Sequence, residues 1–156
     1  MRVALNTITL GRDLDPLEAL RATADAGFDN VGVWFDAISA LQEREGSVQS
    51  LLDLPLRPEE MCFLGGWMWA TGEARDNALQ AAEDRAALAA EIGCPVVIAC
   101  ASGGTGCPDQ AAADFRAIAD IGAKYGVVMA LEYIGAFEQY HDIKSGLALV
   151  RAADHP

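Results

Sequence analysis

The feature that most constrains this chain is a fivefold repeat, in which an apolar run of strand length is followed by a stretch of helix length. The apolar runs are continuous rather than alternating, which is typical of parallel strands that are buried on both faces. Helical crossovers between parallel strands form right-handed βαβ units. The sequence therefore predicts an α/β fold with one parallel sheet. The runs begin about 28 to 35 residues apart, near Val3, Val31, Met61, Val96 and Val127.

Length and composition bound the class of protein. A chain of 156 residues with 52% hydrophobic residues can bury a core, and no linker divides it, so we expect one domain over residues 1–156. The net charge of −12 would repel a phosphate backbone, which argues against a nucleic-acid partner. No run approaches the ~18 apolar residues of a membrane span. Residues 1–6 become polar too early for a signal peptide, so we expect a cytoplasmic protein.

Helix boundaries follow from capping signals at several points. Asp15 and Pro16 are typical of an N-cap and a first helical position. Residues 74–91 are rich in strong helix formers. Asp109 is expected to cap the next helix. The last helix is expected to carry its apolar side chains at helical spacing, namely Ile143, Leu147 and Val150.

The segment from Asp36 to Pro58 fits the repeat least well. Ser47 can cap a short helix there, and Pro55 would end it. The third strand is expected to begin only at Met61 and to end at Leu64. This unit is therefore the least certain in its boundaries.

Two folds use such units, and the repeat alone leaves both open. A five-stranded doubly wound sheet would need about this length. A (β/α)8 barrel would need eight units and ~250 residues, so this chain would be a partial TIM barrel with the first five of eight units. In both folds the chemistry lies at the carboxyl ends of the strands.

Glu132 is the most informative of the strand-end residues, because it ends an otherwise apolar run. A carboxylate in that place is costly unless it is solvated, paired or bound to a metal. It could pair with an Arg or Lys at the edge of a loop, or it could serve a site. Both interpretations stay open on position alone.

Four other residues are candidates for substrate binding. Asn6 could bind a hydroxyl group or serve as a turn or cap residue. Trp34 and Trp67 could stack on a sugar or pack in the core. His141, just beyond the fifth strand, could reach a ligand or lie in solvent.

At this point the sequence resembles the xylose isomerase-like TIM barrels, which include sugar phosphate isomerases and epimerases and inosose isomerase. The resemblance rests on Val128–Gly135, with the pattern Leu-Glu-Tyr-Ile-Gly, on Ala4–Thr7 and on Ala24–Asp29. It extends loosely over the whole chain and implies a barrel that is truncated before strand six.

The resemblance also implies a chemistry. In this family the Glu that ends strand five, here Glu132, is catalytic and is one of four ligands to a divalent metal such as Mn, Mg, Zn or Co. The other three follow strands six to eight. The metal acts on a sugar, sugar phosphate or keto-inositol, and an isomerase or epimerase reaction proceeds through an enediolate.

One ligand does not make a tight metal site, so this segment alone is expected to have little activity. Two alternatives remain. One is a non-catalytic partial barrel that forms homo-oligomers through its open sheet edge, and the other is a five-stranded α/β binding protein.

Overall fold

The computed structural model describes residues 3–11 and 13–155, and the strands within them form one parallel sheet. The strand order is β1-β2-β3-β4-β5, as in a barrel. A doubly wound sheet reverses direction at its first strand, so that alternative is wrong and the partial barrel is confirmed. The strands are β1 (Ala4–Asn6), β2 (Asn30–Trp34), β3 (Arg57–Leu64), β4 (Val96–Cys100) and β5 (Val128–Glu132).

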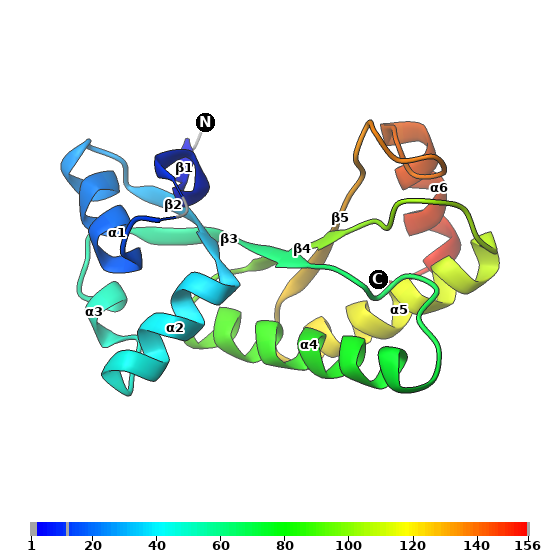
Figure 1. Ribbon diagram of the computed structural model, residues 1–156, viewed down its shortest axis with the longest axis horizontal. Coiled ribbons are helices and arrows are strands. Elements are labelled where there is room, and N and C mark those ends of the chain that lie inside the picture. The colour runs from blue at the N-terminus through cyan, green and yellow to red at the C-terminus, as the bar shows by residue number, and fades with distance from the viewer. Residues whose placement is uncertain (1–2, 12, 156) are drawn as a thin grey trace.

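Helices follow each strand in the described part of the chain. Figure 1 shows α2, α4 and α5 along one side of the sheet, with α1 near its β1 end and α6 near its β5 end. Among the described residues no helix is both long and apolar enough to cross a membrane. The helices are η1 (Thr7–Leu10), α1 (Pro16–Asp25), α2 (Phe35–Glu45), α3 (Gln49–Leu52), α4 (Gly72–Glu91), α5 (Pro108–Lys124) and α6 (Ile143–Ala153).

The two faces of the sheet differ in burial. On the helix-facing side the central strand residues are covered, and Val31, Val33, Met61 and Val97 are each 0% exposed. On the other side, which we call the open face, side chains range from buried to exposed. The expectation that the strands are covered on both faces is therefore wrong for this side. The open face includes Asn6, Gly32, Trp34, Glu60, Cys62, Cys100 and Glu132.

Strand β3 begins four residues earlier than the apolar run predicted. It pairs with β2 from Arg57 onward, and Glu60 lies opposite Gly32. Because acidic residues precede Met61, the apolar run in the sequence begins later than the strand does. A strand with one open face tolerates a polar residue at alternate positions.

The segment after β2 also differs from the prediction. Helix α2 begins directly at Phe35, where no helix was expected. The helix predicted after Ser47 is the short α3, but its N-cap is Val48 and not Ser47. The Ser47 hydroxyl accepts a hydrogen bond from the Gln49 amide at 3.3 Å.

Capping was predicted correctly for α1 and wrongly for α5. The Asp15 carboxylate accepts hydrogen bonds from the Leu17 and Glu18 amides. Helix α5 begins at Pro108 with Cys107 as N-cap, so Asp109 lies in the first turn instead of capping it. Proline sets this start because its fixed φ suits the first helical position.

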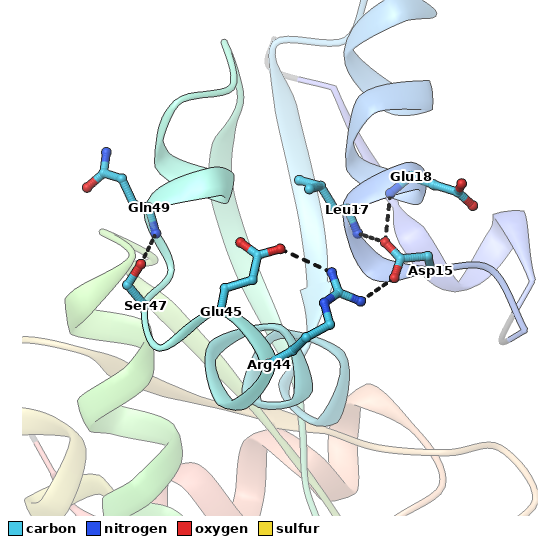
Figure 2. A network of polar contacts seen from close by, with 7 residues as sticks. All are labelled: Asp15, Leu17, Glu18, Arg44, Glu45, Ser47 and Gln49. Atoms are coloured by element: carbon cyan, nitrogen blue, oxygen red, sulfur yellow. Dashed lines mark hydrogen bonds and ion pairs between the residues drawn. The ribbon is translucent and has the colours of Figure 1, made fainter.

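Arg44 joins the end of α2 to the start of α1. Figure 2 shows its guanidinium donating to Asp15 and to Glu45. The hydrogen bond from Arg44 lowers the pKa of Asp15, while that carboxylate also caps α1. One side chain thus ties the first two units of the repeat together.

Helix α6 carries the predicted apolar side chains at helical spacing, and it exposes them. Ile143 is 70% exposed, Leu147 45% and Val150 39%. The helix instead buries Gly146 and Leu149. This apolar surface lies at the same end of the sheet as Val128 of β5, which is 61% exposed.

Candidate functional site

Glu132 ends β5 and points toward the open face. It is exposed and pairs in register with Cys100 of β4. Its two neighbours, Leu131 and Tyr133, lie against Gly146 of α6, where an added Cβ would be 3.6 and 3.4 Å from their side chains. Successive side chains of a strand point to opposite faces, so the Glu132 carboxylate faces away from α6.

The surroundings of Glu132 disfavour the simple surface ion pair. No Arg or Lys of the described residues pairs with it. Burial, followed by the charge and hydrogen bonding of Glu132, raises the pKa of the Cys100 thiol to about 11. A carboxylate that stays near a thiol and lacks a cation is available to a ligand.

A hydrogen-bonded chain of three side chains lies on the same face. The Trp34 indole N–H donates to Asn6 Oδ1 at 2.8 Å. Asn6 Nδ2 then donates to Glu60 Oε1 at 3.0 Å and lies 3.5 Å from the Cys62 sulfur. Asn6 Oδ1 also accepts from the Ile8 amide at 3.2 Å and so caps η1.

Glycine at position 32 makes room for this chain. Gly32 lies between Asn6 and Glu60 in the sheet register. A Cβ there would come within 2.7 Å of Glu60 Oε1 and 3.0 Å of Asn6 Nδ2. Glu60 was not among the predicted site residues. A glycine inside a β-branched strand signals a close approach, so Gly32 could have pointed to it.

The Cys62 thiol is influenced by both carboxylates of this face, Glu60 and Glu132. The pKa of Cys62 is raised to about 11, chiefly by burial; the hydrogen bond from Asn6 lowers it, and the charges of Glu60 and Glu132 contribute to the rise. Glu60 and Glu132 therefore both lie close enough to act on the same sulfur. The open face is acidic from β3 to β5.

Trp34 and Trp67 occupy different environments. Trp34 ends β2 on the open face, with its ring edge-to-face against Phe63 at a centroid distance of 5.6 Å. Trp67 is 2% exposed, donates to the Cys100 carbonyl at 2.9 Å and packs against Phe115 of α5. This placement favours the core-packing interpretation of Trp67 over sugar stacking.

His141 lies in the loop between β5 and α6 and is about half-exposed. Its Nδ1 is 3.2 Å from the Glu138 carbonyl oxygen, and its Nε2 is 4.0 Å from an Asp142 carboxylate oxygen. These contacts stay within its own loop. The structure does not bring His141 into contact with Glu132 or with the Asn6 chain.

The third tryptophan, Trp69, connects the loops after β3, β4 and β5. Its indole donates to the Cys107 carbonyl at 3.0 Å and lies over Gly106, where a Cβ would be 2.4 Å from the ring. Its ring is 6.1 Å from that of Tyr140. Buried Asp114 accepts from the Trp69 amide at 2.8 Å and pairs with Arg75. These contacts fix the loop ends beside the open face.

A cavity of about 320 Å³ lies beside the site but apart from its carboxylates. It is partly open to solvent and is lined by η1, α1 and the junction of β2 with α2, with Trp34 on one wall. Neither Glu132 nor Glu60 lines it. The geometry therefore places the candidate site on the open face and not in this cavity.

The residues of this face do not form a complete metal centre. In the part of the chain that the structure describes, no three His, Cys, Asp or Glu side chains are grouped so that they could hold a metal ion. Divalent cations bind tightly to several hard ligands together. Glu132 can supply one carboxylate to such a site, through one or both of its oxygens.

Comparison with known proteins identifies the family. The xylose isomerase-like TIM barrel family matches residues 13–156. The chain belongs to this family. A search of curated proteins found no match.

Solved structures of the xylose isomerase-like superfamily share this fold. A xylose isomerase domain protein from Alicyclobacillus acidocaldarius is 21% identical, with a TM-score of 0.82 over 100% of this chain and 61% of its own. The IOLI protein, solved with a bound zinc atom, is 14% identical, with a TM-score of 0.81 over 99% and 60%. The 3-keto-D-glucoside 4-epimerase YcjR from E. coli is 17% identical, with a TM-score of 0.80 over 99% and 65%. At these identities the similarity establishes the fold.

The chain spans only part of the proteins it resembles. It covers about 60% of most of these structures, and 25% of a fusion of a xylose isomerase-like barrel with 4-hydroxyphenylpyruvate dioxygenase. The activity of a whole barrel is therefore a matter for proposal here.

Proposed function

We propose that this chain supplies the first five βα units, as a single domain, of a metal-dependent isomerase or epimerase that acts on a sugar or related polyol. The observation that carries the proposal is Glu132, a carboxylate at the carboxyl end of β5 that faces the open side without a cationic partner among the described residues. Family membership and the sugar epimerases among the similar structures support the substrate class.

In this proposal Glu132 acts on the substrate directly. A carboxylate beside a carbon next to a carbonyl can remove or return a proton there. It would also supply one oxygen ligand to a divalent ion (Mn, Mg, Zn or Co), and the remaining ligands would come from outside the described residues. Because those ligands are lacking, we expect the 156-residue chain alone to turn over more slowly than the ~1–10³ s⁻¹ of ordinary enzymes.

The other predicted substrate-binding residues have different roles in this proposal. Trp34 lies on the open face and could present its ring to a sugar. His141 could approach a ligand only if its loop contacts with Glu138 and Asp142 change. Trp67 is covered, so we assign it to packing, and Asn6 acts through its neighbours.

Binding of a ketose tests this function. D-allulose and L-ribulose, substrates named for two similar structures, would be titrated into the ¹⁵N-labelled chain with diamagnetic Mg²⁺ present. We expect shifts at residues 130–134 that Glu132→Gln weakens by about tenfold, since a hydrogen bond to a charged group contributes ~1.5–3 kcal/mol. Glu138→Gln, on the exposed loop after β5, is the matched control. Equal binding by the wild type and Glu132→Gln, or no binding at all, would contradict the proposal.

Self-association is the second candidate. Both edge strands of the described sheet, β1 and β5, lack a further strand partner, and the apolar side chains of α6 are exposed beside β5. Unpaired edges are templates for another chain. Light scattering at increasing salt would detect an oligomer, because salt screens the repulsion between two chains of charge −12. A monomer under all conditions would count against it.

A further inference from the structure

The polar groups of the open face are not equally free to meet a ligand. Asn6 Oδ1 accepts from the Trp34 indole and from the Ile8 amide, while Asn6 Nδ2 donates to Glu60 and contacts Cys62. An amide side chain offers two acceptor positions and two donor hydrogens. Asn6 is therefore fully engaged within the protein.

Glu60 is in the opposite situation. An ionised carboxylate has about four acceptor positions. Among the described residues Asn6 is the hydrogen-bond partner of Glu60, and it contacts only Oε1. The side chain as a whole is half-buried, and its other oxygen, Oε2, accepts no hydrogen bond from the described residues. A donor from a ligand can satisfy it.

The position of Glu60 is also constrained before a ligand arrives. Asn6 is oriented by Trp34 and by its cap on η1, and it holds Glu60 Oε1 from one side. The space that the oxygen occupies exists because residue 32 is glycine. Side chains held in this way act as preorganised binding groups.

We propose that Glu60 is a specificity-determining residue of the site, with a spare carboxylate oxygen that accepts a hydrogen bond from a hydroxyl group of an uncharged polyol or ketose. Asn6 and Trp34 are its positioning residues. This inference rests on the proposed function and narrows it. A hydroxyl donates to the carboxylate, whereas a phosphate group would meet two like charges, Glu60 and Glu132, on one face.

The test compares single substitutions in the same ketose titration of the full chain. Glu60→Gln keeps an oxygen for Asn6 but removes the charge and the second acceptor oxygen. We expect it to weaken D-allulose binding by about tenfold, with the Trp34 indole N–H resonance little changed because Asn6 stays in place. Glu43→Gln, an exposed residue of α2, should bind as the wild type does.

The outcomes separate this inference from the proposed function. Binding that is weakened by Glu132→Gln but unchanged by Glu60→Gln overturns the role of Glu60 and leaves the proposed function standing. Weakening by Glu60→Gln but not by Glu132→Gln supports the role of Glu60 and contradicts that of Glu132. A wild-type chain that binds no ketose overturns both. D-allulose 6-phosphate should bind more weakly than D-allulose, and tighter binding of the phosphate would overturn the inference.

Discussion

The two faces of the five-stranded sheet differ in burial and in polarity. Met61 and Cys62 are neighbours in β3, yet Met61 is 0% exposed against the helices while Cys62 lies half-buried on the open face beside Asn6. The helix-facing side is apolar and closed. The open face carries the hydrogen-bonded polar side chains and both carboxylates. Alternation along a strand thus separates residues that stabilise the fold from those available to a ligand.

The largest effect should come from truncating adjacent residues on opposite faces. Met61→Ala removes a fully buried side chain, so we expect it to lower the free energy of unfolding by about 2–5 kcal/mol. Cys62→Ala should cost about 1 kcal/mol or less, because its site is already partly open. Urea unfolding followed by circular dichroism measures both. Equal losses would show that the open face is packed as tightly as the other.

Alanine substitutions at two glycines, one on each side of the sheet, should give a smaller effect on stability and compare the two faces equally directly. On the helix-facing side, a Cβ at Gly122 would lie 2.6 Å from the Val127 carbonyl oxygen, which is backbone and cannot rotate away. We expect Gly122→Ala to destabilise by about 1–3 kcal/mol. Gly32→Ala would meet the ends of two side chains, which can move.

Gly32→Ala should therefore alter the site more than the stability. We expect it to shift the Trp34 indole N–H resonance, since Asn6 and Glu60 must separate, with less loss of stability than Gly122→Ala. An unchanged indole resonance would contradict the Asn6–Glu60 contact. The two alanine variants are matched, and each serves as the control for the other.

The smallest effect concerns thiol reactivity on the open face. The pKa values of Cys62 and Cys100 are raised to about 11, so both thiols are protonated at pH 8 and should react slowly with iodoacetamide. A neighbouring negative charge raises a thiol pKa, so Glu132→Gln should lower both values. We expect alkylation of Cys100 to speed up roughly twofold.

Peptide mass spectrometry distinguishes these thiols from Cys107, which is exposed. Glu138→Gln controls for the lost charge. Alkylation of Cys100 that is unchanged or slower in Glu132→Gln would contradict the placement of that carboxylate beside the thiol. At pH values well above 11 the difference should vanish, since the thiols are then largely ionised in either protein.

Much of the architecture could be predicted from the sequence, because strands and helices are short-range patterns. The five apolar runs, the cap at Asp15 and the long helix that became α4 all follow from local propensity. The start of β3 and helix α2 could not be predicted in this way. There, polar residues enter a strand and a helix follows a strand with no loop, and only tertiary packing decides such boundaries.

The residues of the candidate site likewise fall into those that the sequence could reveal and those that it could not. Glu132 stood out because a charge ended an apolar run, whereas Glu60 lay among other acidic residues and carried no such contrast. Trp34 and Trp67 could not be separated by sequence, since both follow or end apolar strands. Their different partners, Asn6 for Trp34 and Phe115 for Trp67, come from opposite sides of the sheet.

By itself the sequence determined the class of fold, the family resemblance and the choice of Glu132 as a candidate site residue, because each depends on residue types at short spacing. Only the tertiary structure decided the strand order, the open face and the chain from Trp34 through Asn6 to Glu60. Hydrogen bonds between residues 28 and 54 positions apart depend on strand register, which no local pattern specifies.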